Sequence, residues 1–419
     1  MIDGKLNDYM FKFIEDVCND IGPRESGTEQ ELLAGNMIEE EMKKFCDETH
    51  QEEYISSPHA FLGFISFSAL FAIISVVLFW ISLSIDLGWI SVDRIVSLIL
   101  LIIIAILMTW AVSYLILEVV RYYEAFDFMF AKKTSKNVVG TIEPSGEVKH
   151  TLIFSGHHDS QFQFNLFFYL KRVGQYLITI GLLLIIIAYI FSILKLVFFF
   201  VPINSNAFFF GFGIFFLCLV PVAALFLFFI TYKPVQGAFD NLSGVAIVLG
   251  IGKYLSENKN ESKIFPKHTR IRLVSFAGEE MGLRGSKRYV AAHYNELKES
   301  GAINVNIDGI AEIEKVLVIK KEPFIGAKYR PEFYEPVLKI ARDLGIDMGL
   351  GPLSFGATDG ASFDRKGLPA VTISGLDLSK ELVPYYHTKL DTPEVVDKKA
   401  LGQVLQICLK YMEYIDASA

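Results

Sequence analysis

Four long stretches of this chain contain no Asp, Glu, Lys or Arg, and they restrict its possible folds more than any other feature. They cover residues 60–85, 95–117, 173–194 and 196–232, and they are 26, 23, 22 and 37 residues long. A helix that crosses the hydrocarbon core of a membrane needs roughly 20 apolar residues, whereas a run of about 10–14 is more typical of a soluble core helix. We therefore expect each of the first three stretches to form one transmembrane helix.

The fourth stretch is too long for a single span. Pro202 and the cluster Asn204-Ser205-Asn206 predict a turn in its first half. This turn leaves a span at about residues 207–231. The four spans then form two hairpins, whose short connections are residues 86–94 and about 195–206.

The composition of the whole chain agrees with this division. Apolar residues make up 52% of the 419 residues, but the charged share of 21% is normal, so the apolar excess must lie in blocks. The net charge of −8 and the lack of a long basic run argue against a nucleic-acid partner. The four cysteines are far apart, which predicts neither a disulfide scaffold nor a zinc finger. Residues 1–58 are polar and acidic, so we expect no cleavable signal peptide before the first span.

The hairpins also predict how the chain is oriented. Both return to the side from which they start, so residues 1–59, 119–172 and 233–419 share one side of the membrane. That side carries an excess of Lys and Arg near the spans, whereas the opposite side carries only Arg94 and Lys195. Because Lys and Arg are enriched in cytoplasmic segments, we expect a multi-pass membrane protein with four spans and both termini in the cytoplasm.

Outside the hairpins, at residues 60–118 and 173–232, the chain alternates between strand and helix patterns. Buried strands are predicted at residues 151–155, 271–277, 303–307 and 369–374, and helices at 7–18, 28–46, 241–256, 283–294, 331–344 and 393–412. Such alternation predicts one α/β domain whose sheet is flanked by helices on both faces. In sheets of this kind, the functional site lies beyond the carboxyl ends of the strands.

Side chains that can bind metal ions follow several of the predicted strands. Gly156-His157-His158-Asp159-Ser160 follows the first strand, Glu279-Glu280 the second and Asp308 the third. Two further candidates are Asp240, at a predicted helix start, and His387, after Tyr385-Tyr386. Each signal is weak alone, because an Asp at a helix start is usually a cap. Together, these imidazoles and carboxylates suit zinc or a similar ion, and a carboxylate can bridge two ions roughly 3.5–4 Å apart.

The order of these motifs resembles that of the co-catalytic zinc aminopeptidases of metallopeptidase family 28. This family includes bacterial aminopeptidases, glutamate carboxypeptidase and glutaminyl cyclase. The matching segments are IGPRESG at 21–27, GHHDS at 156–160, AFDNLSGVA at 238–246, FAGEEMGLRGS at 276–286, NVNIDG at 304–309, TDGASF at 358–363 and YHTKLDT at 386–392. The resemblance covers most of the chain outside the hairpins, and these have no counterpart in secreted members.

The resemblance implies a mixed sheet of the zinc-aminopeptidase type, flanked by helices on both faces, and a centre of two divalent ions, which are zinc ions in that family. Asp240 would bridge both ions, His157 and Asp308 would complete the first site, and Glu280 and His387 the second. Glu279 would be the general base, and the Tyr386 hydroxyl would help to stabilise the oxyanion. Asp159 and Asp391 would orient His157 and His387 as hydrogen-bonding neighbours of the ligands.

Two assignments stay open at this point. Either His157 or His158 could face the metal, although the family spacing and the alternation of side chains along a strand favour His157. Thr358, Asp359 and Phe363 are candidates for lining the substrate pocket, and a tight turn before a helix is the alternative.

The resulting hypothesis is a membrane-integrated zinc exopeptidase, most simply an aminopeptidase. The alternatives are an acyltransferase like glutaminyl cyclase, which uses one zinc ion on the same scaffold, and an inactive receptor-like relative. A serine hydrolase is disfavoured because the chain has no G-x-S-x-G motif. A transporter is disfavoured because the spans contain almost no ionisable residue.

The expected partners are peptides and the lipid bilayer. Asp240 is seven residues beyond Lys233, where the fourth span ends. An extended chain covers at most about 3.3–3.6 Å per residue, so this ligand would lie within about 25 Å of the membrane boundary. Residues 161–170 are rich in aromatic side chains, which favour the membrane interface. We therefore expect membrane-associated peptides to be among the substrates.

Overall fold

The computed structural model describes residues 4–261, 264–377 and 382–418. They form two compact units. The α/β unit consists of Met1–Pro58, Phe130–Gln163 and Tyr232–Ala419, and the helical unit consists of His59–Met129 and Phe164–Thr231. Residues 119–129 and 164–172 therefore group with the helices, whereas the sequence had assigned them to the α/β domain.

In the described part of the chain, nine strands form one mixed sheet in the order β1-β2-β6-β3-β7-β11-β8-β10, with β9 paired to β8. Its centre is parallel, because β3 pairs in parallel with β6 and β7, and β7 with β11. The flanking pairs β1–β2, β2–β6 and β11–β8 are antiparallel. The strands are β1 (Glu48–Ser56), β2 (Lys133–Ile142), β3 (His150–His157), β6 (Thr269–Phe276), β7 (Ile303–Asp308), β8 (Leu317–Glu322), β9 (Ala327–Lys328), β10 (Gly349–Pro352) and β11 (Ala370–Ser374).

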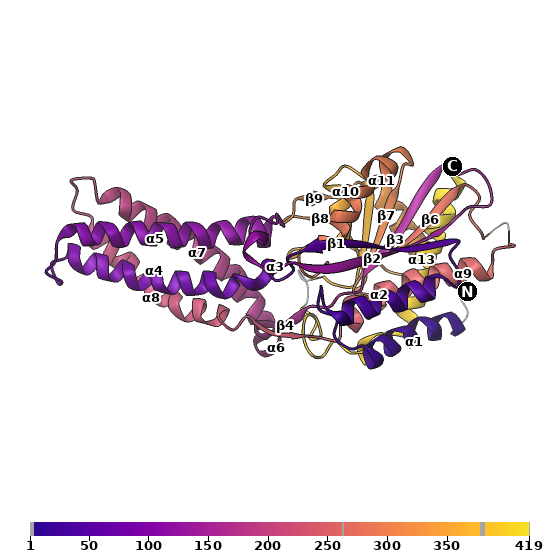
Figure 1. Ribbon diagram of the computed structural model, residues 1–419, viewed down its shortest axis with the longest axis horizontal. Helices are drawn as coiled ribbons and strands as arrows, with labels where there is room; N and C mark the ends of the chain where they lie inside the picture. Colours follow the sequence, from indigo (N-terminus) through magenta and orange to yellow (C-terminus); the bar gives the residue numbers. More distant parts are fainter. Residues whose placement is uncertain (1–3, 262–263, 378–381, 419) are drawn as a thin grey trace. The chain divides into compact units, whose positions relative to one another are not determined.

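Helices flank this sheet on both faces (Figure 1). The helix α9 packs on β3, β6 and β7, and it is in turn covered by α1, α2 and α13. This double cover explains why almost every residue in the first two-thirds of α9 is apolar or small and buried. The helices are α1 (Gly4–Asp20), α2 (Glu29–Met42), α9 (Ser243–Glu257), α10 (Arg284–Glu299), α11 (Pro331–Asp343), α12 (Asp359–Asp364) and α13 (Lys398–Ala417).

The predicted fold class is correct, and the elements that sequence reasoning missed lie mainly at the edges of the sheet. The strand β1 alternates in burial and carries charged side chains, so it has no apolar run to detect. The helix predicted at residues 28–46 starts as expected, with the Thr28 hydroxyl accepting a hydrogen bond from the Glu31 N–H, but it ends at Met42. The span predicted at 207–231 ends at Phe226, and the chain then forms a strand, β5 (Ile230–Pro234).

The helical unit contains four helices, in the described residues, that are long and apolar enough to cross a membrane. They cover Ala60–Asp86, Arg94–Val120, Arg172–Phe198 and Asn206–Phe226. Between 11% and 33% of their most apolar segments is buried inside the protein. Exposed apolar surface of this extent is rare on soluble proteins. The first is built from α3 (Ala60–Gly63) and α4 (Ile65–Asp86), the second from α5 (Arg94–Tyr114) and η1 (Leu115–Val120), and the others are α7 (Arg172–Phe198) and α8 (Asn206–Phe226).

A buried ion pair joins the two hairpins of the helical unit. The Lys195 ammonium in α7 lies 2.5 Å from the Asp86 carboxylate at the end of α4, and it donates to the Ser82 hydroxyl at 3.0 Å. The Ser97 hydroxyl in α5 donates to the same carboxylate at 3.0 Å. Because a buried charge without a partner is costly, these contacts explain how an apolar bundle accommodates Lys195.

Within the α/β unit, the fully buried Arg24 connects three loops. Its guanidinium donates to the carbonyl oxygens of Gly22 at 2.7 Å, His158 at 2.8 Å and Gly237 at 3.1 Å. The Arg24 N–H also donates to the Ser160 hydroxyl. Arg24 therefore ties the segment after α1 to the loop after β3 and to the loop before α9.

We predict that Arg24→Leu destabilises the α/β unit by about 3–5 kcal/mol, because it leaves the buried carbonyl groups of His158 and Gly237 and the half-buried one of Gly22 without this donor. The measured quantity is the free energy of unfolding of the purified chain. It is obtained from thermal and denaturant unfolding, followed by the circular dichroism of the backbone. Arg342→Leu, at an exposed position of α11, is the matched control and should change stability by less than about 0.5 kcal/mol. Equal stability of the two variants would contradict the role of Arg24.

Candidate metal centre

The potential ligands come from loops at one edge of the sheet. His157 is the last residue of β3 and Asp308 is the last residue of β7. Glu280 follows β6, with Glu279 beside it, and β3 lies between β6 and β7 in the sheet. Because these strands are parallel, their carboxyl ends meet, as expected for a site at this edge.

Two other ligands come from outside the sheet. Asp240 lies in the kinked segment η3 (Ala238–Leu242), which leads into α9, and its own backbone is non-helical, with φ −117° and ψ 89°. His387 lies in the loop before α13, in the left-handed region at φ 50°. Both side chains are buried. They approach the strand ends from the loops, and so complete the cluster.

The Asp240 carboxylate lies between the two histidines. Its Oδ1 is 3.2 Å from His157 Nε2, and its Oδ2 is 3.1 Å from His387 Nε2. On the first side, His157 Nε2 is 3.8 Å from Asp308 Oδ1. On the second, His387 Nε2 is 3.3 Å from Glu280 Oε2. Two sets of three ligand atoms result, each lying within 4.8 Å of one another, and Asp240 belongs to both.

The electrostatics of this cluster fit divalent cations. Burial, followed by the Asp240 charge, raises the pKa of Glu280 to about 7. Burial lowers the pKa of His387, but the carboxylates of Glu280 and Asp240 outweigh it and raise that pKa to about 10. Glu280 Oε1 is buried and has no hydrogen-bond partner among the described residues. Divalent ions that bind oxygen and imidazole nitrogen would compensate the negative charge of these carboxylates. They would also supply a partner for the buried Oε1 of Glu280.

Glu279 lies beside the cluster, outside both ligand sets. Its Oε2 is 3.8 Å from His157 Nε2. Burial raises the pKa of Glu279 well above its usual range, with His157 opposing this shift and Asp308 adding to it. Such a carboxylate is more basic than an exposed one, which is what proton transfer near neutral pH requires.

Two buried aspartates hold the ligand loops. Asp159 accepts hydrogen bonds from the N–H groups of Glu279 at 3.1 Å and Glu280 at 3.2 Å, and its Oδ1 lies 3.4 Å from His157 Nδ1. Asp391 accepts from the N–H groups of Phe239 at 2.6 Å and Asp240 at 3.1 Å. Asp159 therefore contacts the histidine we expected it to orient. Asp391 binds the Asp240 segment, a partner that we had not expected.

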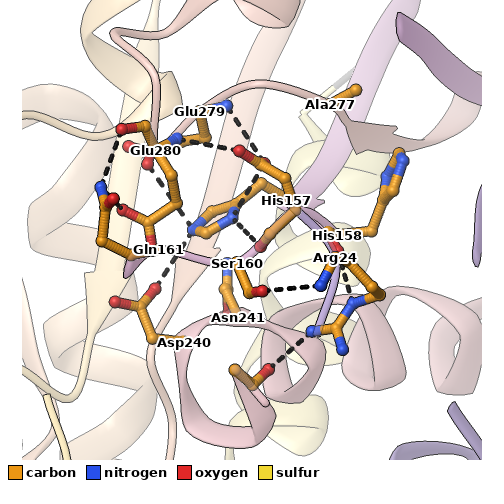
Figure 2. Close-up of polar contacts among 12 residues, drawn as sticks. Arg24, His157, His158, Ser160, Gln161, Asp240, Asn241, Ala277, Glu279 and Glu280 are labelled. Atoms are coloured by element: carbon orange, nitrogen blue, oxygen red, sulfur yellow. Dashed lines mark hydrogen bonds and ion pairs between the residues drawn. The ribbon is translucent and has the colours of Figure 1, made fainter. Parts of the chain in front are cut away.

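His158 points away from the ligand cluster, as the alternation along a strand predicts (Figure 2). Its Nδ1 lies 2.9 Å from the Ser275 hydroxyl, and its Nε2 faces α2 near Gly35. Burial lowers the pKa of His158 to about 4. Its imidazole is therefore neutral at physiological pH and serves the packing between α2 and the sheet.

Tyr386 lies directly against a ligand. Its ring stacks on the His387 imidazole with centroids 3.8 Å apart. Burial and then the Asp240 and Glu280 carboxylates raise the pKa of Tyr386 well above its usual range. The phenol is therefore protonated and able to donate a hydrogen bond.

The three candidates for a substrate pocket are all buried. The Thr358 hydroxyl and N–H donate to the buried carboxylate of Glu322 at 2.7 and 2.9 Å, just before α12. Phe363 packs in the hydrophobic core near Phe276 and Tyr289. Asp359 lies close enough to Asp308 for their charges to interact. Thr358 and Phe363 thus make packing and hydrogen-bonding contacts within the α/β unit, and their role in a substrate pocket stays a prediction.

Sequence reasoning did not identify three residues that support the site. Arg24 was visible only as part of the segment at 21–27. Gln161 directly follows the GHHDS segment, and its amide donates to the Glu280 carboxylate. Glu322 had no signal, because nothing in the sequence shows that it is fully buried.

Comparison with known proteins agrees with this geometry. Residues 223–412 match the model of "Peptidase family M28". Over 170 residues, the chain is 31% identical to the aminopeptidase YwaD of Bacillus subtilis (strain 168). This segment covers 40% of the chain but only 35% of that aminopeptidase, about a third of its length.

Solved structures with the same fold include a zinc aminopeptidase from Bacillus subtilis, with a TM-score of 0.52 and 16% identity. That alignment covers 98% of this chain and 95% of the other. A glutaminyl cyclase from Bacteroides thetaiotaomicron has a TM-score of 0.54 and 14% identity, with 97% of each chain covered. At these identities, the likeness shows the fold.

The family match contains four of the five predicted ligands, and the fifth, His157, lies at the end of β3 beside them. The chain is thus similar to peptidase family M28 over residues 223–412, and it shares the fold of a solved zinc aminopeptidase.

Proposed function

We propose that this protein is a membrane-integrated exopeptidase of the aminopeptidase type that hydrolyses peptides at a centre of two zinc ions. The observation that carries the proposal is the position of Asp240, whose two carboxylate oxygens face two separate ligand sets. His157 and Asp308 would hold the first ion with Asp240, and Glu280 and His387 the second. When bound, two such ions lower the pKa of a bound water and polarise the substrate carbonyl.

The other roles belong to residues around the ligands. Glu279 would accept the proton from water during its attack on the peptide carbonyl, and would return it to the leaving amine. The Tyr386 hydroxyl would donate a hydrogen bond to the carbonyl oxygen as negative charge develops there. The water oxygen thereby becomes part of the new carboxylate, and the proton taken by Glu279 goes to the released amine.

Two alternatives use the same scaffold. An acyltransferase like glutaminyl cyclase is supported by the fold shared with that enzyme, but a complete second ligand set favours hydrolysis by two ions. An inactive receptor-like relative would be expected to have lost ligands, and this chain keeps all five together with Glu279. An aminopeptidase is further favoured by the YwaD relative.

The membrane location is part of the proposal. Four apolar helices support two transmembrane hairpins, and the Lys and Arg distribution favours termini and a metal site on the cytoplasmic side. Peptides that partition to the bilayer surface are the substrates that an enzyme anchored in this way would meet most often. No nucleic-acid partner is proposed.

We predict that Asp240→Ala removes both metal ions, because its carboxylate serves both ligand sets. Metal content per chain, measured by mass spectrometry after dialysis against a weak chelator, should fall from two to nearly zero. Asp343→Ala, at an exposed position of α11, should retain both ions. Full occupancy in Asp240→Ala would refute the bridging assignment.

We predict that Glu279→Gln keeps both ions and lowers kcat roughly 10²–10⁴-fold, as expected for a lost general base. The assay compares peptides with free and acetylated amino termini. The exposed Glu314→Gln is the control and should leave kcat unchanged. Activity that persists in Glu279→Gln would require another base, and equal cleavage of acetylated peptides would contradict the aminopeptidase assignment.

We predict that both termini are cytoplasmic. Cysteines introduced at the exposed Gly4 and Ser418 should react with an impermeant thiol reagent only after cells are opened. A cysteine at Ser91, in the connection between the first two spans, should react in intact cells. The reverse pattern would overturn the orientation, and labelling of only one terminus would mean an odd number of spans.

A further inference from the structure

Gln161 is buried beside the second ligand set, at the point where the chain leaves the α/β unit for its second helical hairpin. Only 2% of its surface is exposed. Its Nε2 donates to Glu280 twice, to the carbonyl oxygen at 2.9 Å and to the carboxylate Oε2 at 3.0 Å (Figure 2). Its Oε1 accepts from the Phe162 N–H at 2.8 Å. Both ends of the amide are therefore used, and the amide cannot rotate without losing these bonds.

These bonds complete the support of Glu280. Its N–H donates to Asp159, and its carbonyl and one carboxylate oxygen accept from Gln161. The other oxygen, Oε1, is buried and has no hydrogen-bond partner in the described part of the chain. The same Oε2 that accepts from Gln161 lies 3.3 Å from His387 Nε2, so the Gln161 amide fixes the carboxylate at the oxygen that faces the second ligand set. The Gln161 amide also stabilises the ionised form that a metal requires, without adding a charge.

We propose that Gln161 is a positioning residue for the second metal ion, the one that Asp240, Glu280 and His387 would hold. This inference rests on the proposed two-ion centre. Gln161 acts through Glu280, whereas His157 and Asp308 of the first set occupy the ends of β3 and β7. The affinity for the second ion should therefore depend on Gln161 more strongly than the affinity for the first.

The main chain of Gln161 explains why this position is well defined. Its carbonyl oxygen accepts from the Val235 N–H at 2.8 Å. Residues 164–231 leave the α/β unit between these two positions. The two segments of the α/β unit that flank the helical insertion are thus hydrogen-bonded to each other at Gln161. This bond holds the main chain of Gln161 in place within the α/β unit, next to Glu280.

The test is the stepwise removal of zinc from the full-length chain by chelator competition. Gln161→Met keeps the length of the side chain but has no donor. In this variant the affinity for one of the two ions should fall roughly 10–100-fold, as is typical when a residue that hydrogen-bonds to a metal ligand is lost. The affinity for the other ion should stay within about twofold of the wild-type value. Gln403→Met, the same change in α13, is the matched control and should leave both steps unchanged.

A double-mutant cycle separates positioning from general loosening of the loop. In a Glu280→Gln background the ionised carboxylate is gone, so adding Gln161→Met should produce no further selective loss. If Gln161→Met leaves the affinities for both ions unchanged, or lowers both equally, the proposal is overturned. If Gln161→Met does not fold, Gln161→Asn, whose amide is too short to reach Glu280, replaces it with the same expected split. Because the readout is metal affinity, a chain that binds two ions without cleaving peptides would refute the proposed function and leave this inference to be judged separately.

Discussion

The structure of the α/β unit depends on a concentration of buried carboxylates around Asp240. Asp240, Glu279, Glu280 and Asp308 all lie at one edge of the sheet, with only two imidazoles among them. Burying like charges together is unfavourable unless cations or hydrogen-bond donors compensate them. The ligand set of two histidines and three carboxylates suits divalent ions, and the surrounding backbone supplies much of the remaining compensation.

That compensation is organised by side chains that lie behind the ligands. Asp159 holds the N–H groups of Glu279 and Glu280, and Asp391 holds the N–H groups that precede and include Asp240. Arg24 ties the His158 and Gly237 carbonyl oxygens together, so the loop that carries His157 and the loop that leads to Asp240 keep a common frame. Neighbours of this kind set the direction in which a ligand presents its donor atom.

The helical unit also compensates the charges that it buries. Its helices are apolar on their outward faces, and among the residues that the structure describes it buries two charged side chains, Glu118 and Lys195. The Glu118 carboxylate accepts a hydrogen bond from the Phe126 N–H at 3.2 Å. Asp86 and Ser82 contact the Lys195 ammonium and so join the two hairpins, and the Ser97 hydroxyl donates to the Asp86 carboxylate. The sequence placed Lys195 at the end of a span but did not show its partner. Asp86 is more than a hundred positions away, so no local pattern connects the two residues.

The sequence by itself determined the apolar helices, the strands of the sheet's centre and the segments that carry the candidate metal ligands. These features are local: uncharged runs, buried β-branched strands, and His or carboxylate residues directly after them. Only the tertiary structure decided the polar edge strand β1, the core position of Phe363, the partner of Asp391 and the support that Gln161 gives to Glu280. Each of these depends on which distant residue lies opposite a side chain, and a contact across 119 positions leaves no periodic trace in the chain.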